Sequence, residues 1–139
     1  MKTRVNCLLV LLLSVGTVTH GLAQSRSIEE IIQGIRETVL KPLRAFESET
    51  PTNCDSKNLQ TAYAAARVTA SLAPDLELRR IAADLTLDIA ESALKHDCLD
   101  FADKVYRSVI STYVGSGYAA HRQRAQIGID DVRAAKKTK

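Results

Sequence analysis

The chain has 139 residues, with 19 Lys and Arg against 16 Asp and Glu, three cysteines and no tryptophan. This length suits one small domain and is too short for two. The small net charge predicts no broad basic surface, which argues against binding to nucleic acid or anionic lipid.

Residues 1–23 have the pattern of a secretory signal peptide. Lys2 and Arg4 give a positive start, a run of leucines and valines follows, and small residues lead to Ala23. This order predicts cleavage after Ala23 and a periplasmic or secreted protein. The apolar run is shorter than the roughly 20 residues of a membrane span, so we expect no stable membrane insertion after cleavage. Removal of this segment leaves 17 basic and 16 acidic residues, a nearly neutral mature chain.

The remaining chain has the composition of an all-α domain. It is rich in alanine and lacks the apolar alternation that is typical of strands. Alanine is the residue that costs least in a helix, and its small side chain lets neighbouring helices approach closely. We expect a single all-helical domain over residues 24–135, followed by a basic tail over residues 136–139.

The first helix is expected to begin after Ser27, which forms a capping box with Glu30. An apolar stripe then recurs at helical spacing: Ile28, Ile31, Ile32, Ile35, Val39, Leu43 and Phe46. Pro42 lies inside this stripe. Because proline removes a backbone donor and crowds the preceding turn, it predicts a kink or break near Leu40.

Four further helices are expected after a loop over residues 48–55. Their approximate ranges are 57–72, 74–95, 99–114 and 117–135, with Asp55 or Ser56 as the cap of the second helix and Ser116 as the cap of the fifth. The third helix carries apolar residues on two sides, which predicts a central position. The connections between these helices are short, so consecutive helices are expected to be antiparallel.

The two helical hairpins share a faint internal repeat. A shift of 40 residues aligns Leu59 and Ala62 with Leu99 and Ala102. The third and fifth helices then fall at matching places. A repeated helix-turn-helix unit favours a stack of hairpins over a closed bundle.

The second of these hairpins resembles the tetratricopeptide-like repeat families. Ala102 is followed four residues later by Tyr106, and Pro74 follows the second helix, where such repeats often have a proline. The resemblance covers about residues 57–135, although its 40-residue spacing exceeds the usual 34. It implies five antiparallel helices stacked as hairpins, with a concave face that binds peptides or protein partners.

Cys54 and Cys98 each directly precede a predicted helix. If these helices are equivalent parts of successive hairpins, they are parallel and begin at the same end of the stack. In an oxidising compartment this arrangement favours a disulfide. Two alternatives stay open: free or intermolecular thiols, and a zinc site made by His96, Cys98 and Cys54 with Asp55 nearby.

The sequence contains no recognisable catalytic motif. His121 has neither an acid partner nor a glycine-framed serine beside it in the sequence, both of which a nucleophilic enzyme would need. Two pairs of nearby arginines, Arg79 with Arg80 and Arg122 with Arg124, are interspersed with acidic residues. They are expected to form surface ion pairs, and an anion site is the disfavoured alternative. We therefore expect a non-catalytic protein without a cofactor.

Tyr113, Tyr118 and His121 are the candidate residues for contact with a partner, because tyrosines often anchor protein interfaces. Tyr118 lies next to a glycine turn and is expected to be the exposed one, whereas Tyr106 is in phase with the core. The leading hypothesis is an exported helical domain that binds a protein or peptide, with an inhibitor or immunity-type protein as one variant.

Two other classes of function compete with this hypothesis. One is a metal-binding or small hydrolytic periplasmic protein that uses the His96, Cys98 and Cys54 cluster. The other is a structural envelope protein whose amphipathic first helix lies on a membrane. The polar face of that helix has as many acids as bases, which disfavours anionic lipid.

Overall fold

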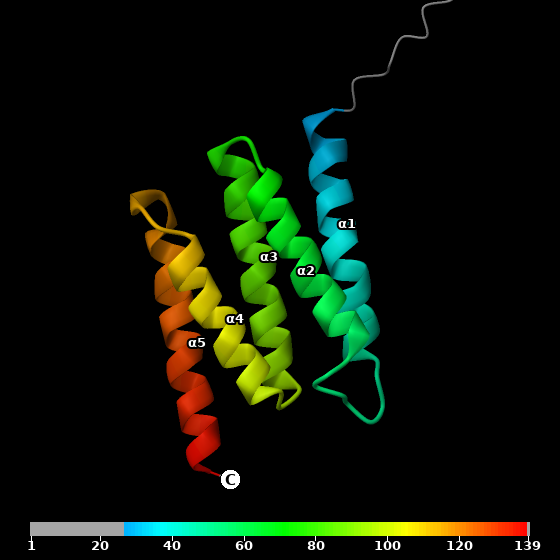
Figure 1. The fold of residues 1–139 in the computed structure, drawn as a ribbon, viewed down its shortest axis with the longest axis vertical. Coiled ribbons are helices and arrows are strands. Elements are labelled where there is room, and N and C mark those ends of the chain that lie inside the picture. The colour runs from blue at the N-terminus through cyan, green and yellow to red at the C-terminus, as the bar shows by residue number, and fades with distance from the viewer. Residues whose placement is uncertain (1–26, 139) are drawn as a thin grey trace, which may run out of the picture.

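A computed structural model of the protein describes residues 27–138 (Figure 1). Its elements are α1 (Ile28–Glu47), α2 (Lys57–Leu72), α3 (Leu76–Lys95), α4 (Leu99–Thr112), a 3-10 turn η1 (Ser116–Tyr118) and α5 (Ala119–Lys137). Over these residues there is no strand, so the all-α prediction is confirmed. The predicted signal peptide, residues 1–23, lies outside the described residues.

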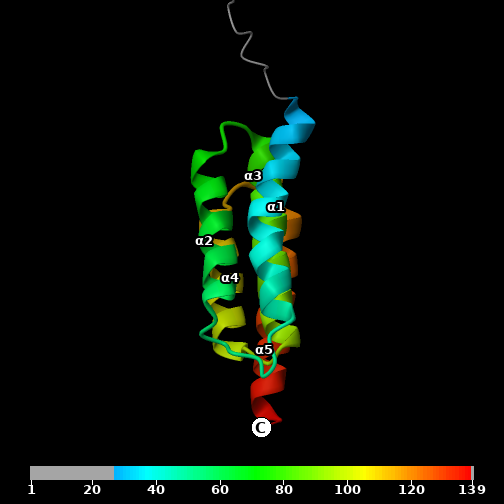
Figure 2. The ribbon, with the colours of Figure 1, turned by 90° about the vertical axis from the view of Figure 1, so that its right-hand side faces the viewer.

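The helices form two layers, and consecutive helices run in opposite directions. α2 and α4 make one layer, while α1, α3 and α5 make the other (Figures 1 and 2). Helix α3 contacts each of the other four helices, which confirms its predicted central position. Its buried residues accordingly lie on more than one side of the helix, from Ala82 to Ala93.

Helix α1 begins as the sequence predicts, with both hydrogen bonds of the capping box between Ser27 and Glu30. Of the kink or break predicted near Leu40, the break is wrong, because α1 continues through Pro42 to Glu47. Residues on both sides of the proline belong to one buried stripe: Val39, Leu43 and Phe46. Packing of this stripe stabilises the continuous helix and outweighs the backbone hydrogen bond that Pro42 removes.

The apolar stripe of α1 is only partly buried. Its second half packs in the core, whereas Ile28 is 66% exposed and Ile31 is 43% exposed in the first half. The apolar stripe predicted for this helix is therefore buried only in its C-terminal half. Here α1 extends past its neighbours at the edge of the stack (Figure 1).

Side chains next to the helix starts cap α2 and α3. Ser56 caps α2, and Glu49 accepts hydrogen bonds from the Ser56 hydroxyl and the Asn58 amide. Asp75 caps α3 by accepting from Leu78 N at 2.9 Å, so Pro74 precedes the helix instead of opening it.

The start of α5 departs from its predicted cap. The Ser116 side chain caps no helix: Ser116 begins the turn η1, and α5 starts after Tyr118 without a side-chain cap. At its other end α5 extends beyond residue 135, so Lys136 and Lys137 are helical. Lys136 forms an ion pair with Asp100 at 2.6 Å.

Tyr106 joins α4 to α5 in the centre of the core. Its side chain is 1% exposed, and its ring lies directly over Gly128, where a β-carbon would overlap the ring atoms. Gly128 therefore allows the two helices to approach closely around an aromatic ring. Five further residues of this helix pair are also buried: Val105, Val109, Ala125, Ile129 and Val132.

Because the Tyr106 hydroxyl is buried, we expect the protein to lose stability at alkaline pH. Burial, with Glu91 and Asp131 nearby, raises the pKa of Tyr106 to about 12. In the unfolded chain a tyrosine ionises near pH 10. Between these values the unfolded state loses the proton first, so the contribution of Tyr106 to stability is unchanged below pH 10 and is lost as the pH rises toward 12. An ultraviolet absorbance titration should show a tyrosine that ionises near pH 12.

The variant Tyr106→Phe serves as the control for this titration. It should remove the latest step of the titration and weaken the decline of stability at alkaline pH. An unchanged titration curve in Tyr106→Phe would contradict the assignment of that step to Tyr106.

Among residues 27–138, no helix combines the length and apolar character needed to cross a bilayer.

Candidate functional site

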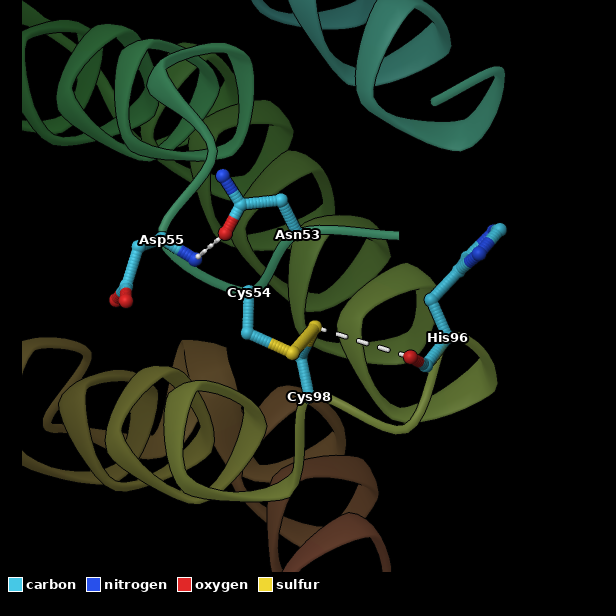
Figure 3. Close-up of a disulfide and its surroundings, with 5 residues drawn as sticks. All are labelled: Asn53, Cys54, Asp55, His96 and Cys98. Atoms are coloured by element: carbon cyan, nitrogen blue, oxygen red, sulfur yellow. Dashed lines mark hydrogen bonds between the residues drawn. A yellow bond between two sulfur atoms is a disulfide. The ribbon is translucent and has the colours of Figure 1, made fainter. Parts of the chain in front are cut away.

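Cys54 and Cys98 form a disulfide, as the sequence predicts (Figure 3). Their Cα atoms are 5.2 Å apart. Cys54 belongs to the exposed loop before α2, while Cys98 is the buried residue directly before α4. The bond therefore joins the starts of two helices that run in parallel within one layer.

The alternative zinc site is not formed in this structure. The sulfur atoms of Cys54 and Cys98 are bonded to each other, and the imidazole of His96 points away from them (Figure 3). That imidazole packs edge-on against Phe46, with 5.2 Å between ring centroids. Within residues 27–138, no three His, Cys, Asp or Glu side chains group closely enough to hold a metal ion.

A pair of aromatic rings forms a second link between α2 and α4, beyond the disulfide. Tyr63 of α2 meets Phe101 of α4 with 5.8 Å between centroids and nearly perpendicular planes. This edge-to-face arrangement is a favourable geometry for aromatic pairs. The two helices are thus tied together near their starts, first by sulfur and then by aromatic packing.

Further along the same two helices lies a groove, which we name the α2–α4 groove. Its volume is about 600 Å³, within the roughly 300–1,000 Å³ range of small-molecule sites. Helices α2 and α4 form its walls, and α3 and the connection to α5 complete it. Its lining residues are Tyr63, Arg67, Ala70, Ser71, Arg79, Thr86, Ser108, Ser111, Thr112, Tyr113, Val114 and Tyr118.

The lining of the α2–α4 groove carries positive charge only. It includes two arginines, Arg67 and Arg79, and no aspartate or glutamate. Among residues 27–138, neither of these guanidinium groups has a carboxylate within ion-pair distance, in contrast to Arg44, Arg107, Arg124 and Arg133. The groove therefore presents unneutralised positive charge beside tyrosine rings.

The expectation of surface ion pairs for these four arginines is wrong for Arg79, Arg80 and Arg122, which bind backbone carbonyls and have no ion pair among residues 27–138. Arg79 Nε donates to Ala73 O at 3.1 Å, and Arg80 Nε donates to Gly117 O at 3.2 Å. Arg122 donates to Tyr113 O and Gly115 O. Ala73 and Tyr113 are the residues that end α2 and α4, where carbonyls lack helical partners and guanidinium donors satisfy them. Gly115 and Gly117 belong to the connection between α4 and α5.

Arg124 is the member of these four arginines that does form ion pairs. It reaches Glu91 at 2.8 Å and Asp88 at 3.2 Å on α3, and so ties α5 to α3. Burial raises the pKa of Asp88, while the hydrogen bond from Arg124 opposes that shift. His121 of α5 also contacts α3, since its Nε2 lies 3.2 Å from Oδ1 of Asp84.

The exposure predicted for Tyr118 is wrong. Tyr118 is 9% exposed, and its ring packs against Tyr113 and His121, with centroids 5.4 and 6.0 Å away. The turn η1 folds back onto the end of α4 and buries the ring, whereas a glycine turn by itself suggests solvent exposure. Tyr113 is also buried, yet both tyrosines contribute to the lining of the α2–α4 groove.

Tyr113 links this cluster to the central helix. Burial raises the pKa of the Tyr113 hydroxyl, and a hydrogen bond with Thr86 opposes the shift. Thr86 is itself buried on α3 and donates to Ala82 O at 2.7 Å. The rings that border the groove are therefore held by the core, which gives the groove a defined shape.

A second, wider hollow of about 740 Å³ surrounds the exposed side of the disulfide. Its charged lining is mixed: three aspartates, Asp55, Asp97 and Asp100, are opposed by Lys104 and Lys136. Acidic and basic groups thus lie together in this hollow, with one more acidic than basic residue. The α2–α4 groove is the stronger candidate because its charge has one sign.

Comparison with known proteins identifies no matching family model, no matching curated protein and no matching solved structure. The candidate site is therefore argued from the geometry and chemistry of this chain.

Proposed function

We propose that this protein is exported and acts without catalysis, by binding a segment of a protein partner in the α2–α4 groove. The observation that carries the proposal is the groove itself, a hollow of about 600 Å³ between two tethered helices. Three largely buried tyrosine rings, those of Tyr63, Tyr113 and Tyr118, border the groove and hold its shape, and aromatic residues of this kind are common at protein interfaces. An inhibitor or immunity-type protein that captures an exported enzyme is one form of this function.

Two features of the chain support export. The basic and apolar order of residues 1–23 is that of a signal peptide. The disulfide between Cys54 and Cys98 is of a kind that persists in oxidising compartments. A periplasmic or secreted location is part of the proposal for these reasons.

The arrangement of helices favours a tetratricopeptide-like classification as part of the same proposal. Helices α2 and α3 form one antiparallel hairpin and α4 and α5 form the next, with α2 and α4 side by side in one layer (Figure 2). Stacked repeats of this kind commonly bind partners along an extended surface that spans several helices. The groove lies in this layer.

The chemistry of the lining supports binding over catalysis. A hydroxyl nucleophile requires an adjacent base such as histidine or a carboxylate. The lining of the groove contains hydroxyls and arginines, and neither histidine nor a carboxylate accompanies them.

Site-specific photo-crosslinking in the producing cells tests this function. A photoreactive amino acid at Ser111, an exposed lining residue, should form an adduct with a defined protein. The same photoreactive amino acid in place of Gln123, which is exposed on α5 and outside the groove lining, provides the matched control. Adducts of equal yield at both positions, or none at Ser111, would contradict the proposal.

A further inference from the structure

We infer that the α2–α4 groove selects an acidic segment of its partner, whose carboxylates pair with Arg67 and Arg79. This inference rests on the proposed function and specifies the chemistry of the bound segment. The groove contains two guanidinium groups without carboxylate partners among residues 27–138, and no acidic side chain lines it.

Arg67 is available for a ligand. Its guanidinium carbon lies 5.8 Å from the centroid of the Tyr63 ring, a cation–π contact that orients the group without using its hydrogen-bond donors. Within the described part of the chain the guanidinium has no hydrogen-bond acceptor. A guanidinium carries five N–H donors in a planar fork that matches a carboxylate.

Arg79 is held in place by the protein and still has free donors. Its Nε binds Ala73 O at the end of α2, which fixes the side chain at the groove. The two terminal amino groups of the guanidinium have no acceptor among residues 27–138. Because the side chain is already anchored, less conformational entropy is lost when these donors bind a carboxylate.

The three serine hydroxyls of the lining do not compete for this role. Those of Ser71, Ser108 and Ser111 each donate to a backbone carbonyl of their own helix. Their single protons are used, so their oxygens remain as acceptors. The groove thus offers cationic donors for carboxylates and neutral acceptors for peptide N–H groups, a combination that suits an acidic peptide better than a nucleic acid.

Apolar surface beside the arginines indicates what flanks the acidic residues. Val114 lines the groove and is 69% exposed, and the rings of Tyr63 and Tyr113 border the same space. An apolar or aromatic side chain of the partner would cover this surface. The bound segment is therefore acidic with at least one apolar residue.

Fluorescence anisotropy with synthetic peptides tests this inference on the disulfide-bonded protein. The probe is an acetylated and amidated peptide in which glutamates flank a phenylalanine, and its counterpart has glutamine at each glutamate. We expect the acidic probe to bind at least tenfold more tightly than the counterpart, with affinity falling as salt rises. Arg67→Gln should weaken binding of the acidic probe about tenfold.

Two variants control for net charge and for folding. Arg36→Gln removes the same charge from an exposed position on α1, outside the groove, and should leave affinity unchanged. Arg67→Lys keeps the charge but loses the planar fork, so it should bind more weakly than the wild type and more tightly than Arg67→Gln. Circular dichroism of each variant verifies that the helices are retained.

Several results would overturn the inference. Equal binding of the glutamine counterpart would show that carboxylates are not selected, and equal losses in Arg36→Gln and Arg67→Gln would show a general charge effect. Displacement of the acidic probe by an oligothymidine would point to a nucleic acid instead. A partner crosslinked at Ser111 through a segment without acidic residues would leave the proposed function intact while refuting this inference.

Discussion

Replacing Cys54 with serine and Cys98 with alanine is expected to lower the free energy of unfolding by about 4 kcal/mol. The disulfide spans 44 residues, so its loss returns a large conformational entropy to the unfolded chain. Alanine is chosen at position 98 because that residue is 2% exposed, and serine would bury a hydroxyl there. Thermal unfolding followed by circular dichroism should show a Tm lower by roughly 15 °C.

A reducing agent supplies the matched control for this pair of substitutions. It should lower the Tm of the wild type toward that of the double variant and leave the variant itself unchanged. Thiol titration of the denatured, unreduced mature protein should find no free thiol. Detection of two free thiols, or a Tm of the wild type that is insensitive to reduction, would contradict the disulfide and its role.

The disulfide also shows what sequence reasoning could predict. The pairing of Cys54 with Cys98 followed from a chain of local inferences: each cysteine precedes a helix, and helices two places apart in an antiparallel stack begin at the same end. Caps such as Ser27 are likewise local signals that involve only neighbouring residues. Such features are decided within a few residues, so a sequence pattern is sufficient to find them.

Tyr118 shows where this reasoning fails. A tyrosine beside a glycine turn has no local feature that indicates burial. Its burial depends on η1 folding back, with Gly117 against Leu76 of α3 and Arg80 bound to Gly117 O. These contacts join residues 37 positions apart or more, and the sequence does not reveal them.

The α2–α4 groove was missed for a related reason. Its two arginines belong to different helices, α2 and α3, and adjacent acidic residues suggested ordinary surface ion pairs for Arg79. The distinction between a paired and an unpaired arginine depends on which helix faces meet. One signal was present in the sequence: Ser108, Ser111 and Thr112 place three hydroxyls on one face of α4, next to Lys104.

The variant Gly128→Ala is expected to lower the free energy of unfolding by about 3 kcal/mol, at the upper end of overpacking costs. The added β-carbon would overlap the buried ring of Tyr106, so α4 and α5 must separate or the ring must leave its position. Glycine in a helix interior is otherwise unfavourable, and alanine would ordinarily stabilise by about 1 kcal/mol. The steric overlap therefore makes this substitution destabilising, although helix propensity alone predicts that it stabilises. Urea unfolding of the wild type and the variant measures the difference in the free energy of unfolding.

Gly34→Ala is the matched control, because Gly34 lies in the exposed interior of α1 and an added β-carbon would meet nothing within 4 Å. This variant should be more stable than the wild type by about 0.5–1 kcal/mol. Combining Gly128→Ala with Tyr106→Leu should cost less than the sum of the two single changes, since the smaller side chain relieves the overlap. Equal effects of the two glycine substitutions would refute the close contact between Tyr106 and Gly128 that joins α4 to α5.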